Sequence, residues 1–296
     1  MTSFFDQRSN RNHVAVIDGR STINYGTKKF TVQRNNDCFW VFYMIISHTH
    51  KFIYIKNRKV GSTSTEKALQ KICGPDDIIT PDHIHESDSD VLKPGAQNFE
   101  GYFLPFRELI GARSLVDAAR TFRDFLSRPK FYNHMRASSV RSRIPKKIWD
   151  SYYKFCVERN PWDKSISYFY WFNKNNPDAE LNTFYRNYRK HGTLDQVFAS
   201  DWSRYTYQNK IIVDEVIDFS NLSVGVCNAL INAGVPADTV NKMIFPKEKS
   251  NIRKSDKYKI DAHTDELIRL VFRNEIANFR FCQNPEISLE AYGRDP

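Results

Sequence analysis

The segment Phe52–Thr65 reads FIYIKNRKVGSTST, an apolar strand pattern followed by a short turn rich in hydroxyl groups. The residues Thr65–Ile72 have apolar side chains at helical spacing and are followed by Gly74-Pro75, so they predict a helix. Backbone N–H groups at the start of such a helix can bind an anion, and Gly61 allows a close approach of the backbone. The segment therefore predicts a phosphate-binding loop between a core strand and a core helix.

This loop differs from the nucleotide-kinase loop, in which a Lys follows the second Gly of G-x-x-x-x-G-K-[ST]. Here Lys59 precedes Gly61. The pattern resembles instead the 5′-phosphosulfate loop of sulfotransferases that use 3′-phosphoadenosine 5′-phosphosulfate, which reads roughly K-x-G-[ST]-[ST]-[ST]. The resemblance implies donor contacts from Arg58, Lys59, Val60, Gly61, Ser62, Thr63 and Ser64. An ordinary N-capped helix is the alternative interpretation.

A second segment, Lys154–Tyr168, reads KFCVERNPWDKSISY and again shows an apolar run that meets a helix, with Pro161 near the helix start. It resembles the 3′-phosphate motif of the same family, which begins R-[ND]-P-x-x-[RK]-x-x-S. The resemblance implies that Arg159 and Ser167 bind the 3′-phosphate, because Arg offers a planar fork of donors. Lys164 stands where the family more often has Arg, and we interpret it as a supporting residue.

Sulfuryl transfer needs a base for the acceptor's proton and positive charge at the leaving phosphate. Lys59 is the expected source of that positive charge. The segment Phe131–Arg141 resembles a stretch that precedes the 3′-phosphate strand in carbohydrate-type sulfotransferases. That resemblance implies His134 as the base, with a loop-bonding His as the alternative. Glu66 is the second candidate, because some relatives use a Glu, although an acid also suits a helix start. A third set of candidates is His83, His85 and Glu86.

Residues 247–255 read KEKSNIRKS and match in position the C-terminal stretch that closes over the nucleotide in sulfotransferases. The match implies contacts to the 3′-phosphate or the adenine from Lys249, Ser250, Arg253 and Lys254. A solvated basic loop is the alternative. Trp162 and Tyr168 are expected either to flank the adenine or to pack in the core. Arg58 is expected either to add to the positive field at the donor or to be solvated.

The composition restricts the class of partner. The chain has 296 residues, a formal net charge of +10 and a pI near 9.3, which implies an anionic partner. Nucleic acid is not predicted, because Lys and Arg are spread along the chain and no binding signature appears. The five Cys contain no C-x-x-C, so neither a disulfide framework nor a metal site is indicated, and a cytoplasmic location is expected. The apolar run Cys38–Ile46 is too short to span a membrane and predicts a buried strand.

The resemblance implies an α/β fold with a central parallel sheet flanked by helices, like that of P-loop kinases, in a single domain over residues 1–296. Residues 1–48 are expected to form an N-terminal extension, 49–281 the nucleotide-binding core and 282–296 a C-terminal tail. An insertion at about 80–130 is expected to bind the acceptor. A strand pattern at 215–219 and helix patterns at 222–233 and 264–279 resemble later elements of the family.

These observations predict a sulfotransferase that acts on a hydroxyl, or less favourably an amine, of a sugar or small natural product. The product of the donor would be adenosine 3′,5′-bisphosphate, and the family needs no metal. The acidic segment Asp82–Asp90 is expected either to line the acceptor pocket or to form a solvated surface loop. In the first case it favours a cationic or neutral acceptor. Two other classes stay open: a nucleotide kinase of similar fold, which would need Mg²⁺ and ATP, and a non-catalytic polyanion-binding protein. Neither the acceptor nor the oligomeric state is predicted.

Overall fold

The computed structural model describes residues 15–17, 20–25, 28–32, 44–80, 95–101, 109–110, 114–126, 130–246, 260–279 and 281. The chain divides into two compact units, Met1–Trp40 and Val41–Pro296. In the first unit, strands β1 (Ala15–Ile17), β2 (Arg20–Tyr25) and β3 (Lys28–Val32) form an antiparallel sheet in that order. The second unit includes a strand that starts at Ile45, ahead of the core boundary expected at residue 48.

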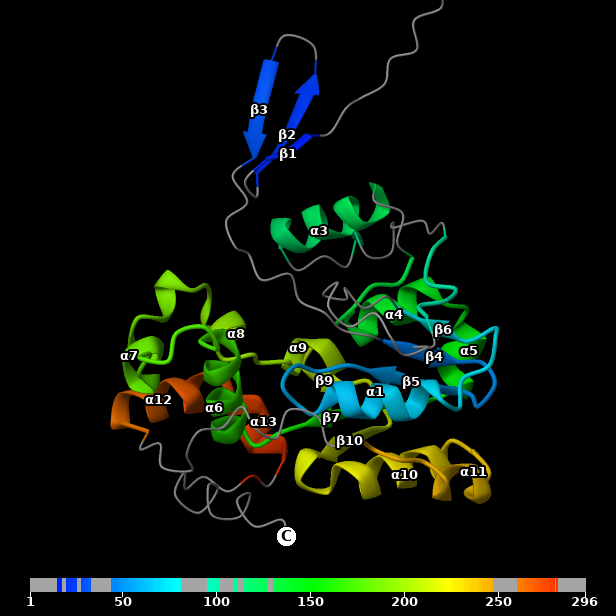
Figure 1. The fold of residues 1–296 in the computed structure, drawn as a ribbon. Helices are drawn as coiled ribbons and strands as arrows, with labels where there is room; N and C mark the ends of the chain where they lie inside the picture. The colour runs from blue at the N-terminus through cyan, green and yellow to red at the C-terminus, as the bar shows by residue number, and fades with distance from the viewer. Residues whose placement is uncertain are drawn as a thin grey trace, which may run out of the picture. The chain divides into compact units, whose positions relative to one another are not determined.

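The second unit is built on a five-stranded sheet in the order β10-β7-β5-β4-β6 (Figure 1). The strands are β4 (Ile45–Ser47), β5 (Phe52–Ile55), β6 (Ile78–Ile79), β7 (Tyr153–Glu158) and β10 (Glu215–Asp218). Strands β10, β7 and β5 are parallel, whereas β4 pairs antiparallel with both β5 and β6. The sheet is therefore mixed. Strand β6 is antiparallel to β4 and so runs in the same direction as β5, and the prediction of a parallel sheet is wrong for β4. The reason is the short turn between β4 and β5, because such a turn can join only antiparallel neighbours.

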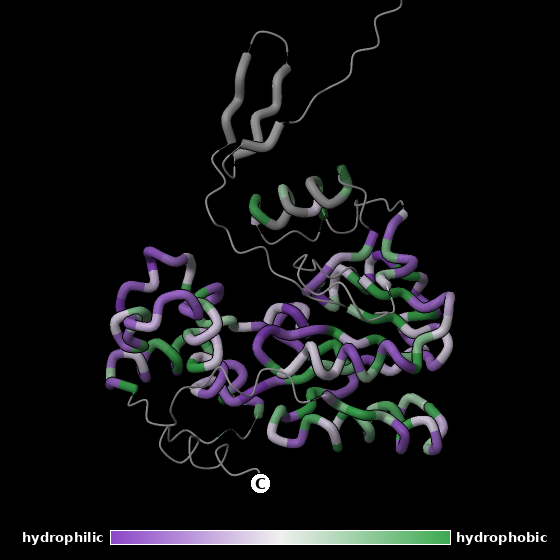
Figure 2. Tube along the Cα trace, in the orientation of Figure 1, coloured by the Kyte–Doolittle hydropathy of each residue, from purple (hydrophilic) through white to green (hydrophobic). Residues whose placement is uncertain are grey.

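Helices cover both faces of this sheet. Successive side chains of a strand point to opposite faces, so they belong to two different cores. Ile53 and Ile55 belong to one core, together with helices α4 (Ala137–Arg143) and α5 (Lys146–Ser151). Phe52 and Tyr54 belong to the other core. Its helices are α1 (Ser62–Gln70), α10 (Leu222–Asn232) and α11 (Ala237–Asn241). Figure 2 shows hydrophobic residues along α10 and within the sheet. The architecture is thus mixed α/β, with a central sheet flanked by helices.

A third core holds together a helical lobe. The lobe consists of α6 (Pro161–Phe172), α7 (Leu181–Arg186), η1 (Tyr188–Lys190), α8 (Leu194–Val197), α12 (Ala262–Val271) and α13 (Arg273–Asn278). Its buried side chains include Trp162 and Phe169 of α6, Tyr185 of α7 and Ile268 of α12. Because α6 follows directly after β7, the lobe lies next to the carboxyl ends of the parallel strands (Figure 1).

The remaining described elements are α3 (Leu115–Leu126), α9 (Trp202–Tyr205), β8 (Thr206–Tyr207), β9 (Lys210–Ile211) and η2 (Phe219–Asn221). Helix α3 falls within the expected insertion at about 80–130, of which 81–94, 102–108, 111–113 and 127–129 lie outside the described residues. Within the ranges that the structure describes, we find no helix both long and apolar enough to cross a bilayer.

Several expected elements are present with shifted boundaries. Helix α1 begins at Ser62, ahead of the expected Thr65, and ends at Gln70. The patterns at 215–219 and 222–233 are confirmed as β10 and α10. The helix expected over 264–279 is divided at Phe272 into α12 and α13. Of the strand expected at Cys38–Ile46, the structure shows β4 from Ile45, and residues 38–43 lie outside the described ranges.

Candidate functional site

The candidate site lies where the three parallel strands end. Strand β5 leads into α1, β7 into α6, and β10 through η2 into α10, so three connections start at the same edge of the sheet. In open α/β sheets, ligands bind outside the carboxyl ends of the parallel strands, and the following helices direct their N-terminal N–H groups toward that space. Both sequence segments singled out above lie at this edge.

The loop between β5 and α1 has the backbone of a tight turn. Lys59 and Gly61 both have positive φ angles, 59° and 64°. The Gly61 carbonyl accepts the N–H groups of Ser64 (3.1 Å) and Thr65 (3.2 Å), which starts helix α1. A Cβ atom on Gly61 would lie 2.9 Å from side-chain atoms of both Phe219 and Leu222, so the loop packs against the start of the third connection. Gly61 is therefore required both by its φ angle and by this close packing.

The structure brings the two predicted phosphate loops together through Arg159. Its Nη1 atom donates a hydrogen bond to the carbonyl oxygen of Lys59 at 3.0 Å, and its guanidinium lies 4.2 Å from the centre of the Phe219 ring. Arg159 also pairs with Asp163 in the first turn of α6. The Lys59 ammonium lies 5.6 Å from the centre of the Trp171 ring, near the end of α6. One arginine thus contacts all three connections at the sheet edge.

The other residues predicted for the donor lie in the loop after β5 and on helices α1 and α6. Ser62 is buried in the first turn of α1, whereas Thr63 and Ser64 are partly exposed. Ser167 is half-buried on α6, and Val60 is fully buried in the core beneath the loop. Ser62 and Thr63 are the first two residues of α1, so their N–H groups are among those that an α-helix leaves without an intrahelical acceptor, whereas the Ser64 N–H donates to the Gly61 carbonyl.

Arg58 is held by Asp201, so the alternative of a solvated Arg58 is wrong. Asp201 accepts hydrogen bonds from the Arg58 backbone N–H (2.7 Å) and Nε (2.8 Å). The Arg58 Nη2 atom donates to the carbonyl oxygens of Ser200 (2.5 Å) and Asp195 (3.2 Å). Its guanidinium therefore fastens the loop to the segment before α9.

Asp201 is the centre of a buried charge network that the sequence did not reveal. Besides Arg58, its carboxylate pairs with Lys164 of α6 at 2.9 Å and with Arg204 of α9 at 2.6 Å. Burial opposes ionisation, but these three cations together hold the pKa of Asp201 far below its usual range. Lys164 also pairs with Glu158 at 2.6 Å and is completely buried. Lys164 thus supports the site indirectly, as the buried partner of the Asp201 and Glu158 carboxylates.

His134 occupies a strained turn beside the loop. Its φ angle is +51°, its Nδ1 atom lies 3.1 Å from the carbonyl oxygen of Lys56, and its own carbonyl accepts a hydrogen bond from Arg204. Burial, together with the charges of Arg204 and Lys56, lowers the pKa of His134 well below 6.5. The imidazole is therefore neutral at physiological pH, with a lone pair that can accept a proton.

Both candidate bases contact Lys56, the first residue after β5. The Lys56 ammonium forms a buried ion pair with Glu66 of α1, while its carbonyl bonds the imidazole of His134. The Glu66 carboxylate is therefore already engaged by an ammonium, whereas the His134 imidazole bonds a neutral carbonyl. Sequence reasoning missed Lys56, although its position directly after an apolar strand was the available signal.

The structure also decides one alternative for the aromatic residues. Trp162 is fully buried and Tyr168 is 2% exposed, and both belong to the core of the helical lobe. The prediction that they flank an adenine is therefore wrong, and the core alternative is confirmed. The remaining predicted residues lie outside the described ranges: His83, His85, Glu86, the segment Asp82–Asp90, Lys249, Ser250, Arg253 and Lys254.

Comparison with known proteins gives a family relationship but no activity. The chain is 30% identical over 107 residues to an uncharacterized protein from Archaeoglobus fulgidus, a match that covers 35% of this chain and 86% of the archaeal protein. The chain therefore belongs to the same family as that protein. No protein-family model matches the chain, and no solved structure matches it.

Proposed function

We propose that this protein is a sulfotransferase that moves a sulfuryl group from 3′-phosphoadenosine 5′-phosphosulfate to a hydroxyl, or less favourably an amine, of a sugar or small molecule. The observation that supports it most is the hydrogen bond from Arg159 to the Lys59 carbonyl. This bond joins two loops that carry separate motifs, one for the 5′-phosphosulfate and one for the 3′-phosphate of the same nucleotide. In this proposal the three parallel strands and their helices form the P-loop-like part of the fold.

The proposed roles follow from position and charge. The start of α1 and the loop from Lys59 to Ser64 hold the 5′-phosphosulfate, and Arg159 with Ser167 holds the 3′-phosphate. The ammonium of Lys59 neutralises the bridging oxygen as that oxygen leaves with the phosphate. Lys59 lies over the Trp171 ring, on a flexible four-carbon chain that can turn toward the donor.

His134 is the proposed base. A hydrogen bond from Nδ1–H to the Lys56 carbonyl places the lone pair on Nε2, which takes the acceptor's proton. The acceptor oxygen then forms the new bond to sulfur, while the bond from sulfur to the bridging oxygen breaks and its electron pair goes to the departing adenosine 3′,5′-bisphosphate. Because burial keeps the imidazole neutral, the base is ready without prior deprotonation.

Thermal unfolding in the presence of nucleotides tests the class of ligand. We expect adenosine 3′,5′-bisphosphate to raise the midpoint temperature more than ATP or AMP at equal concentration, because it alone carries both phosphates in the required positions. A larger shift with Mg²⁺ and ATP would identify a kinase instead. Equal shifts for all nucleotides, with binding that falls steeply with salt, would identify a polyanion-binding protein.

A substitution of Arg159 tests the proposed 3′-phosphate contact. We expect Arg159→Ala to weaken binding of adenosine 3′,5′-bisphosphate by about 10- to 100-fold, the loss of a charge-assisted contact, but to change AMP binding much less. Isothermal titration measures both constants. Arg269→Ala, which removes an exposed arginine on α12 that pairs with Asp265, is the matched control. Equal losses for both nucleotides would contradict the assignment of Arg159.

A further inference from the structure

Helix α3 presents an apolar face that the rest of the described structure leaves exposed. One stripe along the helix consists of exposed apolar residues at helical spacing: Leu115, Ala119, Phe122 and Leu126. Among the described residues, Leu115 and Ile110 are the two most exposed large apolar side chains, at 89% and 87%. None of the described members of the three cores comes from α3. Such a concentration of exposed apolar side chains indicates an interaction surface.

The opposite face of α3 is polar. In its sequence, LVDAARTFRDFL, the positions away from the apolar stripe are taken by polar residues: Asp117, Arg120, Thr121 and Asp124. A helix that is apolar on one side and charged on the other is typical of segments that lie in the interface of a lipid bilayer. With 12 residues, α3 is too short to cross a bilayer, so such binding would be peripheral.

The charge of the segment around α3 favours a bilayer with anionic headgroups. Residues 107–130 contain six Lys or Arg and three Asp or Glu, and therefore have a net charge of +3. Positive charge next to an interfacial helix attracts acidic lipids. Two copies of this chain, each with a net charge of +10, repel each other. An anionic lipid surface is therefore a better occupant of the apolar face than a second copy.

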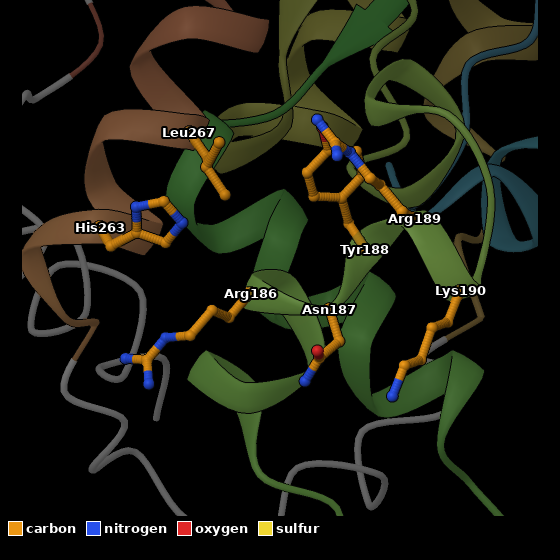
Figure 3. A pocket seen from close by; sticks show the side chains of 7 residues that line it. All are labelled: Arg186, Asn187, Tyr188, Arg189, Lys190, His263 and Leu267. Carbon is orange, nitrogen blue, oxygen red and sulfur yellow. The ribbon is translucent and has the colours of Figure 1, made fainter.

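Positive charge alone does not define a binding site, as the helical lobe shows. Figure 3 shows a hollow at η1 and the start of α12, where the side chains of Arg186, Arg189 and Lys190 point in different directions. Arg186 pairs with Asp261, and Arg189 lies 5.8 Å from the ring centre of Tyr188. These cations do not converge on one ligand, so we assign no site to this hollow.

We propose that α3 binds the surface of a lipid bilayer that carries anionic headgroups. The apolar stripe enters the boundary between the headgroups and the acyl chains, and the positive charge of residues 107–130 attracts the headgroups. The inference uses none of the residues assigned to the sulfuryl donor. It therefore stands or falls independently of the proposed reaction.

Flotation of the full chain with lipid vesicles tests this inference, in the absence of any nucleotide. One kind of vesicle consists of phosphatidylcholine alone, and the other contains about one third phosphatidylglycerol, which is anionic. We expect the protein to float with the anionic vesicles and to stay largely behind with the neutral ones. Raising the salt concentration should release part of the bound protein, because salt screens the attraction between charges.

The double variant Leu115→Ser/Leu126→Ser should lower the partition onto anionic vesicles by about tenfold or more, because two apolar side chains no longer enter the bilayer. The matched control is Val224→Ser/Ile231→Ser, which removes two exposed apolar side chains from α10 and should float as the wild type does. All four positions are exposed, so both variants should keep the fold, and circular dichroism checks this.

Three results would overturn the inference. The first is a wild-type protein that floats with neither kind of vesicle, or equally with both. The second is an equal loss in the two double variants, which would indicate unspecific adsorption. The third comes from light scattering without vesicles: a dimer that Leu115→Ser/Leu126→Ser converts to a monomer would show that the apolar face of α3 binds a second copy instead.

Discussion

Asp201 is the single residue on which the geometry of the candidate site depends most. It is fully buried, and it binds a cation from each of three segments: Arg58 in the loop after β5, Lys164 on α6 and Arg204 on α9. Arg204 in turn bonds the carbonyl of His134. The proposed donor loop and the proposed base are therefore positioned by one carboxylate.

Asp201→Asn should destabilise the protein strongly, because it leaves buried cations without their counter-charge. We expect a loss of ~3–5 kcal/mol in the free energy of unfolding, the usual cost of breaking a buried ion pair from one side. Urea unfolding followed by tryptophan fluorescence measures it. Asp150→Asn, which removes an exposed partner of Lys146 on α5, is the control and should cost about 0.5 kcal/mol or less. Similar losses in the two variants would contradict the central role of Asp201.

The contrast between Lys59 and Asp201 shows what the sequence can reveal at the level of single residues. Lys59, Gly61 and Arg159 were predicted because their chemistry depends on neighbours only a few positions away. Asp201 and Lys56 act through partners that are distant in the sequence, such as Arg58 and Asp201, which are 143 positions apart. Only the fold brings such partners together, so no local pattern marked Asp201, and for Lys56 the one local signal was its position directly after an apolar strand.

The boundaries of helices are likewise only partly predictable from the sequence. The helix after β5 was expected from Thr65, because Ser and Thr in a row are typical of turns. In the structure Ser62, Thr63 and Ser64 form its first turn, since Gly61 provides the left-handed residue from which the helix starts. Helix α10 was predicted well, because its apolar residues and Gly234 give a clear start and stop. The division of the C-terminal helix at Phe272 had no Gly or Pro to signal it.

Helix α13 carries a buried acid that should make its packing depend on pH. Burial and the nearby Glu158 raise the pKa of Glu275 to about 8, and its Oε2 atom has no hydrogen-bond partner among the residues that the structure describes. The folded state therefore binds more protons than the unfolded state between pH 4.5 and about 8, and stability falls as the pH rises through that window. Below that window Glu275 is neutral in both states.

Glu275→Gln keeps the shape of the protonated side chain but cannot ionise. Relative to the wild type, the variant should gain up to about 1.4 kcal/mol in the free energy of unfolding for each pH unit between 5 and 8. Urea unfolding at several pH values measures this difference. Glu266→Gln, at an exposed position on α12, is the matched control and should show no such trend. A constant difference between Glu275→Gln and the wild type across the window would show that Glu275 is ionised throughout.

For the whole unit Val41–Pro296, the layered α/β arrangement was predictable but the exact sheet was not. Apolar strand runs that each lead into an amphipathic helix indicate parallel strands, and three of the five strands follow that rule. Strands β4 and β6 are only three and two residues long. Such short segments carry too little pattern for their pairing direction to be read from the sequence.

The pH dependence of global stability combines these buried groups, and His134 should govern its acid side. Because the folded-state pKa of His134 lies below 6.5, the unfolded state binds more protons once the pH falls under that value. Stability contributed by the neutral imidazole is therefore present above about pH 6.5 and is lost as the pH falls toward the folded-state pKa. Glu275 has the opposite effect over part of the same range, so the two contributions oppose each other in the wild type.

His134→Gln should isolate this contribution, because Glu275 and the buried Asp residues are unchanged and cancel in the difference from the wild type. Below pH 6.5 the variant should gain stability relative to the wild type by up to about 1.4 kcal/mol per pH unit, and above pH 7 the difference should be constant. Urea unfolding from pH 5 to 8 measures it, with His263→Gln, at an exposed position on α12, as the control. A difference that stays constant down to pH 5 would show that the imidazole of His134 is as easily protonated as one in water. It would then lose the property that makes it suitable as the neutral base of the proposed reaction.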